Sequence, residues 1–228
     1  MAYYIGGGGM TADARVRDWV DGWVLSRGAA PPSAEPWGFT VHVGLESHVS
    51  RHVLGAVNDG VREGDVREAA RSVRATGAQL KVFADPERVL PWLGPGWEPY
   101  DLGDVLMTAE LTGAEPPAPP AGYRVRTWTR DGVTRVLVTD AEGTFAARGQ
   151  TATTGASTVV DMIETSEDHR RRGLGRVVMG TLQAAARAGG ARRGVLAGTP
   201  AGQFLYRSLG WRTVAPLTNA RRRPATAA

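Results

Sequence analysis

The stretch Ile163-Glu-Thr-Ser-Glu-Asp-His-Arg-Arg-Arg-Gly-Leu-Gly-Arg-Val-Val178 joins two elements of different type. The β-branched run 157–165 predicts a strand, and the Leu-, Met- and Ala-rich run 174–187, ended by two glycines, predicts a helix. The loop between them holds three consecutive arginines and two glycines. Because the first amides of a helix lack intrahelical acceptors and arginine adds fork-shaped donors, this loop is an anion cradle that fits a pyrophosphate. Taken alone, the cluster fits an exposed basic turn before an amphipathic helix better than it fits a binding loop.

The elements around this loop predict a mixed α/β sheet, in the α+β manner. Strands are expected at 123–128, 134–139 and 144–151 before it, and at 195–197 after it. A last helix is expected at 200–209, with proline at its start and Gly210 after its end. Further toward the N-terminus we expect a strand at 37–44, helices at 47–57 and 62–76, and a strand at 80–84. Residues 11–28 are expected to begin as a short helix and end as a strand.

The segment Arg170-Arg-Arg-Gly173-Leu-Gly175 resembles the Gln/Arg-x-x-Gly-x-Gly/Ala signature of the GNAT superfamily of acyl-CoA-dependent N-acetyltransferases. Phe204-Leu-Tyr-Arg-Ser-Leu-Gly-Trp211 is similar to the Leu-Tyr-x-x-Leu-Gly-Phe element of that family. The resemblance covers 157–211, and the strands of 123–151 are consistent with it. Two positions depart from the common pattern, since Thr199 and Gly202 stand where many members carry Asn and Ala. Thr199 can still cap the last helix.

The resemblance implies an N-acetyltransferase that moves an acetyl group from acetyl-CoA to a primary amine by direct attack. It implies that the backbone of Ile163, Glu164 and Thr165 pairs with the pantetheine arm, and that Tyr206 protonates the departing thiolate. Asp161 is the first candidate for the base and Glu164, on the opposite face of the strand, is the second. The pyrophosphate would lie on the loop formed by Arg170, Arg171, Arg172, Gly173, Leu174, Gly175 and Arg176.

The Pro-rich stretch 113–122 is where we expect the domain boundary. It separates residues 1–112 from a cofactor-binding lobe at 123–218, which is followed by a disordered basic tail at 219–228. The halves resemble each other weakly at an offset of 113–114 residues, as in Gly77–Pro86 and Gly190–Pro200, which suggests two tandem GNAT-like lobes. The first half lacks the Arg/Gly cradle. We therefore expect it to be a degenerate lobe that completes the acceptor cleft.

Composition excludes several classes of protein. The chain of 228 residues has 27 basic and 23 acidic side chains and no cysteine, which excludes disulfides and thiolate chemistry. No apolar run is long enough to cross a membrane, and residues 1–10 do not form a signal peptide but a loose tail, so a cytoplasmic protein is expected. His48 and His52 lie four residues apart without a third ligand, so no metal is expected.

Two alternative functions, an idle acyl-CoA-binding module and a nucleic-acid-binding protein, make different demands on the sequence. A catalytically idle acyl-CoA-binding module, acting as a sensor or partner, would need no proton donor, and the presence of Tyr206 favours the enzyme. Nucleic-acid binding would need a basic stripe across one face, whereas the clustered arginines lie in one loop and one tail. The expected partner is a small-molecule or peptide amine, and the chain is expected to be a monomer or a homodimer.

Overall fold

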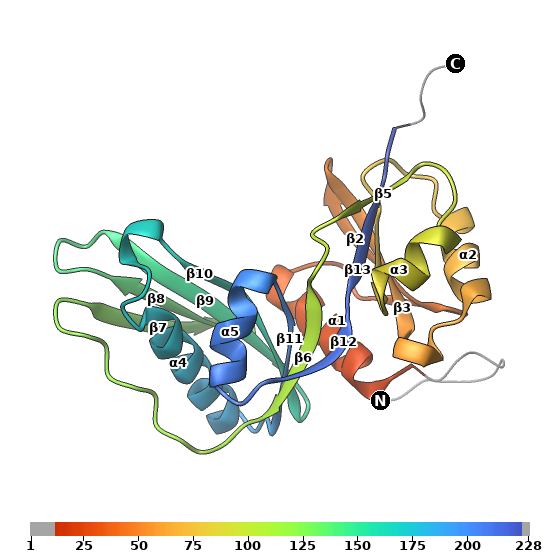
Figure 1. Cartoon of the computed structure of the whole chain (residues 1–228). Helices are drawn as coiled ribbons and strands as arrows, with labels where there is room; N and C mark the ends of the chain where they lie inside the picture. Colours follow the sequence, from red (N-terminus) through yellow and green to blue (C-terminus); the bar gives the residue numbers. More distant parts are fainter. Residues whose placement is uncertain (1–11, 225–228) are drawn as a thin grey trace.

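The computed structural model describes residues 12–224, so the loose tail expected at 1–10 lies outside the described part. Two mixed sheets, each with its own helices, lie side by side (Figure 1). The helices are α1 Ala14–Arg27, α2 Glu63–Ser72, α3 Pro86–Val89, α4 Leu174–Ala188 and α5 Pro200–Ser208. Short 3₁₀ turns are η1 Asn58–Gly60, η2 Leu90–Trp92 and η3 Glu167–His169.

The first sheet has six strands in the order β1-β2-β3-β4-β13-β5. Its strands are β1 Ser33–Glu35, β2 Gly38–Leu45, β3 His48–Val57, β4 Gln79–Phe83, β5 Trp97–Tyr100 and β13 Thr218–Arg222. Only β3 and β4 run parallel, and α2 is the crossover between them. Apolar residues of α2 and α3 pack on this sheet in one core that includes Val66, Leu80 and Val89.

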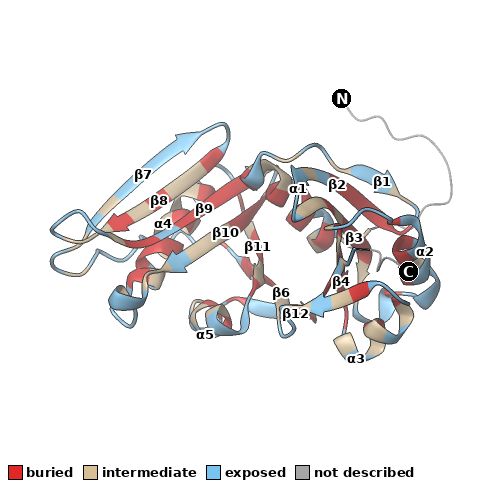
Figure 2. Cartoon of the chain, turned by 90° about the horizontal axis from the view of Figure 1, so that it is seen from above, coloured by how far each residue is buried: buried red, intermediate tan, exposed pale blue. Residues whose placement is uncertain are grey.

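The second sheet has seven strands in the order β12-β6-β11-β10-β9-β8-β7. Its strands are β6 Val105–Glu110, β7 Arg124–Arg130, β8 Val133–Thr139, β9 Phe145–Thr154, β10 Ser157–Thr165, β11 Arg193–Gly198 and β12 Arg212–Pro216. The parallel pair here is β10 and β11, joined through α4. Burial is greatest in the central strands and falls to the exposed outer strand β7 (Figure 2). Leu182 of α4 and Trp211 lie in the core on one face of this sheet.

The two sheets exchange their last strands, which corrects the expected boundaries. Strand β6 precedes the Pro-rich stretch yet lies between β11 and β12, and β13 follows the second lobe yet lies between β4 and β5. The tail expected to be disordered from residue 219 is therefore strand through Arg222. The reason is burial: Thr218, Asn219 and Ala220 are almost fully enclosed, and β13 supplies hydrogen bonds to both neighbouring strands. Residues 225–228 lie outside the described part.

This exchange follows from a duplicated arrangement. The order β3-α2-β4-α3-β5-β6 in the first half repeats as β10-α4-β11-α5-β12-β13 in the second. The exchanged strands begin at Val105 and Thr218, and 218 − 105 = 113, which is the offset found in the sequence. The predicted mixed α/β architecture with two tandem lobes is thus confirmed.

Two local predictions were wrong. The stretch 47–57 was expected to be a helix but forms β3, because it fills the position between β2 and β4 and hydrogen-bonds to both. The strand expected at the end of 11–28 is the last part of α1, which stays helical to Arg27 and ends at Gly28 in the left-handed conformation. The segment 113–122 contains no helix or strand, and it packs on α4, where Pro117 covers Gly180.

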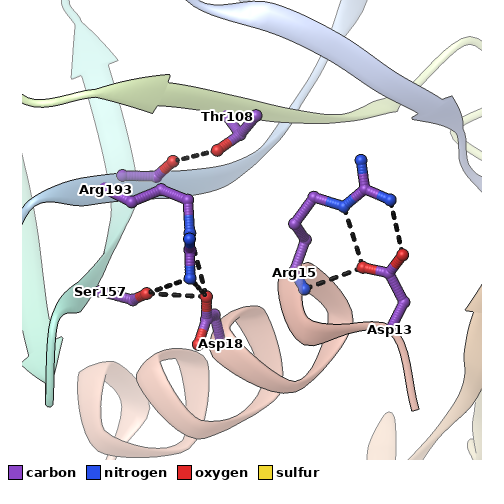
Figure 3. A network of polar contacts seen from close by, with 7 residues as sticks. Asp13, Arg15, Asp18, Thr108, Ser157 and Arg193 are labelled. Atoms are coloured by element: carbon purple, nitrogen blue, oxygen red, sulfur yellow. Dashed lines mark hydrogen bonds and ion pairs between the residues drawn. The ribbon is translucent and has the colours of Figure 1, made fainter. Parts of the chain in front are cut away.

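Helix α1 joins the two lobes. Its apolar side chains, such as Val20, share one core with Val53 of β3 and Val195 of β11. Its polar side chains contact the second sheet, where Asp18 accepts hydrogen bonds from Ser157 at 2.7 Å and from Arg193 (Figure 3). Although α1 lies before the first sheet in the chain, it therefore covers the open face of the second one.

Candidate active site

The central opening of the second lobe begins where β10 leaves β11. The ladder between these strands ends at the pair Val159 and Val195, whereas β10 stays paired with β9 as far as Thr165. A bulge between Asp161 and Glu164, with Met162 at φ 55°, bends β10 away. In the described chain, no strand pairs with the β11-facing edge of β10 beyond the bulge. This edge carries the backbone of Ile163, Glu164 and Thr165, which the sequence assigned to the pantetheine arm.

The loop after β10 presents unpaired amides at the start of α4. Gly173 is the N-cap at φ 80°, and no side chain caps the helix. Within residues 12–224, the backbone N–H groups of 171–175 have no hydrogen-bond acceptor. The side chains of Arg170, Arg171, Arg172 and Arg176 are exposed around them. Gly175 has a packing role as well, because a Cβ there would come within 2.8 Å of Leu205 in α5.

A cavity of about 290 Å³ lies between the lobes and continues to the bulge of β10. Helix α1 and strands β3 and β4 form one side of it, and β10, β11 and α5 form the other. Its lining residues are Trp19, Trp23, Arg27, Arg51, Lys81, Asp104, Val159, Val160, Asp161, Met162, Ile163, Ala197, Thr199, Tyr206 and Leu217. Ile163 belongs both to this lining and to the free edge of β10, so the two features are continuous.

Tyr206 reaches the cavity from α5, and its ring is held on two sides. The side chain is 8% exposed, with Trp211 on one side at a ring-centroid distance of 6.4 Å. A Cβ at Gly202 would come within 2.8 Å of the ring, so a glycine is needed there to admit the tyrosine. Thr199 caps the helix by accepting from the N–H of Gly202 at 3.4 Å, as the sequence predicted. Burial, followed by the negative charge of Asp161, raises the pKa of Tyr206 to about 12.

The two carboxylates named from the sequence lie in different surroundings. Asp161 lines the cavity, and its oxygens accept from Arg27 through two nitrogens, from Ser26 Oγ at 2.9 Å and from the N–H of Met162 at 2.9 Å. Glu164 is exposed and pairs with Arg148 at 2.7 Å. It does not line the cavity. The structure thus brings Tyr206 and Asp161 to one cavity and leaves Glu164 outside it.

Four charged residues of the first half line the cavity, and sequence reasoning missed them: Arg27, Arg51, Lys81 and Asp104. Lys81 donates to Tyr100 Oη and Asn219 Oδ1, both at 2.8 Å, and Asn219 in turn donates to Asp104 Oδ2 at 3.1 Å. The Arg51 guanidinium lies over the ring of Trp23, 3.8 Å from its centroid. One feature of the sequence could have pointed to Lys81 as a functional residue. It is the only lysine among 27 basic residues, and it interrupts an apolar strand.

Comparison with known proteins assigns the second half to a family. Residues 105–211 match the model of the acetyltransferase (GNAT) family. Residues 105–211 form a GNAT acetyltransferase domain. The free edge of β10, the α4 loop and Tyr206 all lie inside the matched GNAT domain. A search of curated proteins gives no match.

Solved structures show the same fold over nearly the whole chain. A GCN5-related N-acetyltransferase from Kribbella flavida is 19% identical, with a TM-score of 0.63, over 96% of this chain and 98% of that one. A GCN5-related N-acetyltransferase from Sphaerobacter thermophilus is 12% identical, with a TM-score of 0.54, over 95% and 96%. A GCN5-related N-acetyltransferase-like protein from Streptococcus suis is 14% identical, with a TM-score of 0.54, over 82% and 85%. At these identities the likeness concerns the fold.

The other sequence-derived candidates lie away from the GNAT cavity. His169 is a loop residue whose Nδ1 lies 2.9 Å from Tyr123 Oη. His52 lies between Thr40 and Ser50, each within 3.1 Å of a ring nitrogen. In the described residues, no group of three or more His, Asp and Glu side chains is arranged to hold a metal ion.

None of the helices described for 12–224 is long and apolar enough to span a membrane.

Proposed function

We propose that the chain is an N-acetyltransferase that moves an acetyl group from acetyl-CoA to a primary amine. The observation that carries this proposal is the continuity between the free edge of β10 and a cavity that holds the Tyr206 side chain. Ile163 belongs to both, so a thioester whose pantetheine arm lies along the edge would end beside the tyrosine. The fold of the GNAT domain supports the same reading.

Acetyl-CoA would be held by backbone groups more than by side chains. The unpaired amides of 171–175, at the positive end of the α4 dipole, fit the pyrophosphate. Arg170, Arg171, Arg172 and Arg176 add charge around Gly173, Leu174 and Gly175. The backbone of Ile163, Glu164 and Thr165 would pair with the amides of the pantetheine arm, as an added strand does.

Tyr206 is suited to the leaving sulfur. In the reaction a C–N bond forms and the C–S bond breaks, so negative charge develops on sulfur while the nitrogen loses a proton. With a pKa of about 12, Tyr206 stays protonated at neutral pH. Its O–H can therefore donate a hydrogen bond to the sulfur as that charge develops, and the thiol leaves protonated.

The proton of the amine needs an acceptor, and two carboxylates line the cavity. Asp161 was the first candidate, but both of its oxygens already accept two hydrogen bonds each. A carboxylate has about four acceptor positions, so this set saturates it. Asp104 Oδ1 is buried and has no partner among the described residues. Burial also raises the pKa of Asp104, which makes it a stronger base. We favour Asp104 as the proton acceptor, with Asp161 positioning α1 and β10.

Turnover of acetyl-CoA on a panel of primary amines tests the proposal, with release of the CoA thiol as the readout. Tyr206→Phe is expected to lower kcat about 100-fold or more, while CoA binding stays unchanged. Tyr123→Phe, which removes a hydroxyl bonded to His169 outside the cavity, is the matched control and should keep its activity. CoA binding without turnover on any amine would instead favour an idle acyl-CoA-binding module.

The two carboxylates are separated by a second pair of variants. Asp104→Asn is expected to lower kcat/KM and to remove the acidic limb of the pH profile. Asp161→Asn should keep that limb, and because it removes the charge that raises the Tyr206 pKa, it should move the alkaline limb to lower pH. The reverse pattern would assign the base to Asp161.

A further inference from the structure

The cavity carries one cation more than its own carboxylates balance. Its lining includes Arg27, Arg51 and Lys81 as cations and Asp104 and Asp161 as anions, so the formal sum is 3 − 2 = +1. Arg27 is paired with Asp161. Lys81 is linked to Asp104 through Asn219. Arg51 is the cation that is left over.

The Arg51 guanidinium stacks through its face, and within residues 12–224 its N–H groups make no hydrogen bond. The guanidinium carbon lies 3.8 Å from the ring centroid of Trp23 and 5.5 Å from that of Trp19. These stacking contacts use the plane of the group, whereas its N–H bonds point outward in that plane. The Nε atom is buried, and in the part of the chain that the structure describes it has no hydrogen-bond partner. A buried donor without an acceptor is costly, and the guanidinium keeps unused donor capacity beside the cavity that Arg51 lines.

Lys81 lines the same cavity as Arg51. The Lys81 nitrogen donates to Tyr100 and Asn219, which fix it in place, and the protonated form has a third N–H for an anion. Burial, followed by the charge of Arg51, lowers the pKa of Lys81 well below its ordinary value, and an anion bound between the two side chains would counter both effects by favouring the protonated lysine. Both side chains come from the half of the chain that lacks the GNAT signature.

We propose that the acceptor is a small aminocarboxylate, whose carboxylate binds Arg51 and Lys81 while its amine faces the Tyr206 end of the cavity. This inference rests on the proposed function and names its substrate class. A volume of about 290 Å³ is at the small end of ligand cavities, which favours an amino acid or a short peptide over a bulky amine. The Trp19 and Trp23 rings would flank the carbon skeleton of such a ligand.

Matched substrate pairs test the inference. The full chain is assayed with acetyl-CoA and the common amino acids, each beside its carboxamide, in which only the negative charge is removed. The free acid is expected to have the higher kcat/KM by about 10- to 100-fold. Arg51→Gln should reduce this ratio to near one and Arg51→Lys should keep part of it, whereas Arg124→Gln, an exposed arginine on β7, should leave it unchanged. Equal rates for acids and amides, or an equal loss on both in Arg51→Gln, would overturn the inference.

A binding readout keeps this inference apart from the proposed function. Because Trp19 and Trp23 flank Arg51, the same amino acids are titrated against tryptophan fluorescence, for the wild type and for Arg51→Gln. Saturable binding that is lost in Arg51→Gln, without turnover, would keep the carboxylate site and reject the transferase. Turnover at equal rates on acids and carboxamides would support the transferase and reject the carboxylate site. If no amino acid binds or reacts, the aminocarboxylate class is rejected.

Discussion

Gly22 of α1 lies directly against Val159 of β10, so closely that a Cβ added at Gly22 would come within 2.4 Å of Val159 Cγ2. The contact fixes the distance between α1 and the second sheet. Since α1 also carries Trp19, Trp23 and Arg27 into the cavity, the same contact sets one of the cavity's dimensions.

Gly22→Ala is expected to lower the free energy of unfolding by about 1 to 3 kcal/mol, because overpacking outweighs the gain in helix propensity. Urea denaturation measures this change. Gly64→Ala is the matched control, since Gly64 is also helical and a Cβ there would meet nothing within 4 Å. Equal effects of the two substitutions would show that α1 can shift away from β10 without cost.

Asn219 is the side chain through which the exchanged strand β13 contributes to the cavity. It is 0% exposed and bonds both Lys81 and Asp104. Asn219→Ala leaves the buried Lys81 amino group and the partly buried Asp104 carboxyl each short of a partner, so we expect a loss of about 2 to 4 kcal/mol in stability. Arg221→Ala on the same strand breaks only the exposed pair with Glu98 and should cost less than about 1 kcal/mol. Calorimetry of both variants checks the difference, and equal losses would contradict it.

The parts that the sequence could predict are those decided by local signals. The run β10-α4-β11-α5 has a β-branched strand, a strong helix former run and Pro200 at a helix start, and each was placed within a few residues. Strand β3 has no such signal, and only its pairing with β2 and β4 determines its conformation. The same holds for β13, whose Thr-Asn-Ala-Arg-Arg sequence is typical of a solvated tail until two strands enclose it.

The residues that line the cavity fall into the same two groups, those that a sequence motif predicts and those that only tertiary packing brings together. Tyr206 and Asp161 lie in one motif-bearing half, so the motif leads to them. Arg51, Lys81 and Asp104 lie on separate elements of the other half, and only the packing of α1 and the exchanged strands brings them together. No spacing in the sequence predicts that these three residues line one cavity.

His52 makes the stability of the first lobe depend on pH. The side chain is 8% exposed, and burial lowers its pKa from 6.5 to about 4. Below pH 6.5 the unfolded chain takes up a proton that the folded chain does not, so stability should fall as the pH falls from 6.5 toward 4. The slope for one such group is about 1.4 kcal/mol per pH unit at most. Urea unfolding at pH 7 and pH 5 measures it.

Replacing that histidine separates its contribution from the background. His52→Gln should make the acid-side loss shallower, although it lowers stability at pH 7 by disturbing the contacts with Thr40 and Ser50. Ser50→Ala removes one of those contacts but keeps the histidine, so it should lower stability while the slope remains. An unchanged slope in His52→Gln would mean that other groups carry the pH dependence.

Gly173 and Gly190 flank opposite ends of α4. Alanine substitutions at the two positions distinguish the cost of backbone strain from an effect on acetyl-CoA binding. Both have positive φ, 80° and 95°, and a Cβ on either would meet nothing within 4 Å. Alanine at each should therefore cost about 1 to 2 kcal/mol of backbone strain alone. Only Gly173 lies among the amides of 171–175, so Gly173→Ala should also raise the KM for acetyl-CoA, about 10-fold, by turning those amides away from the pyrophosphate. Gly190→Ala should leave that KM unchanged. If both variants lose stability equally and neither changes the KM, the diphosphate does not bind at the start of α4.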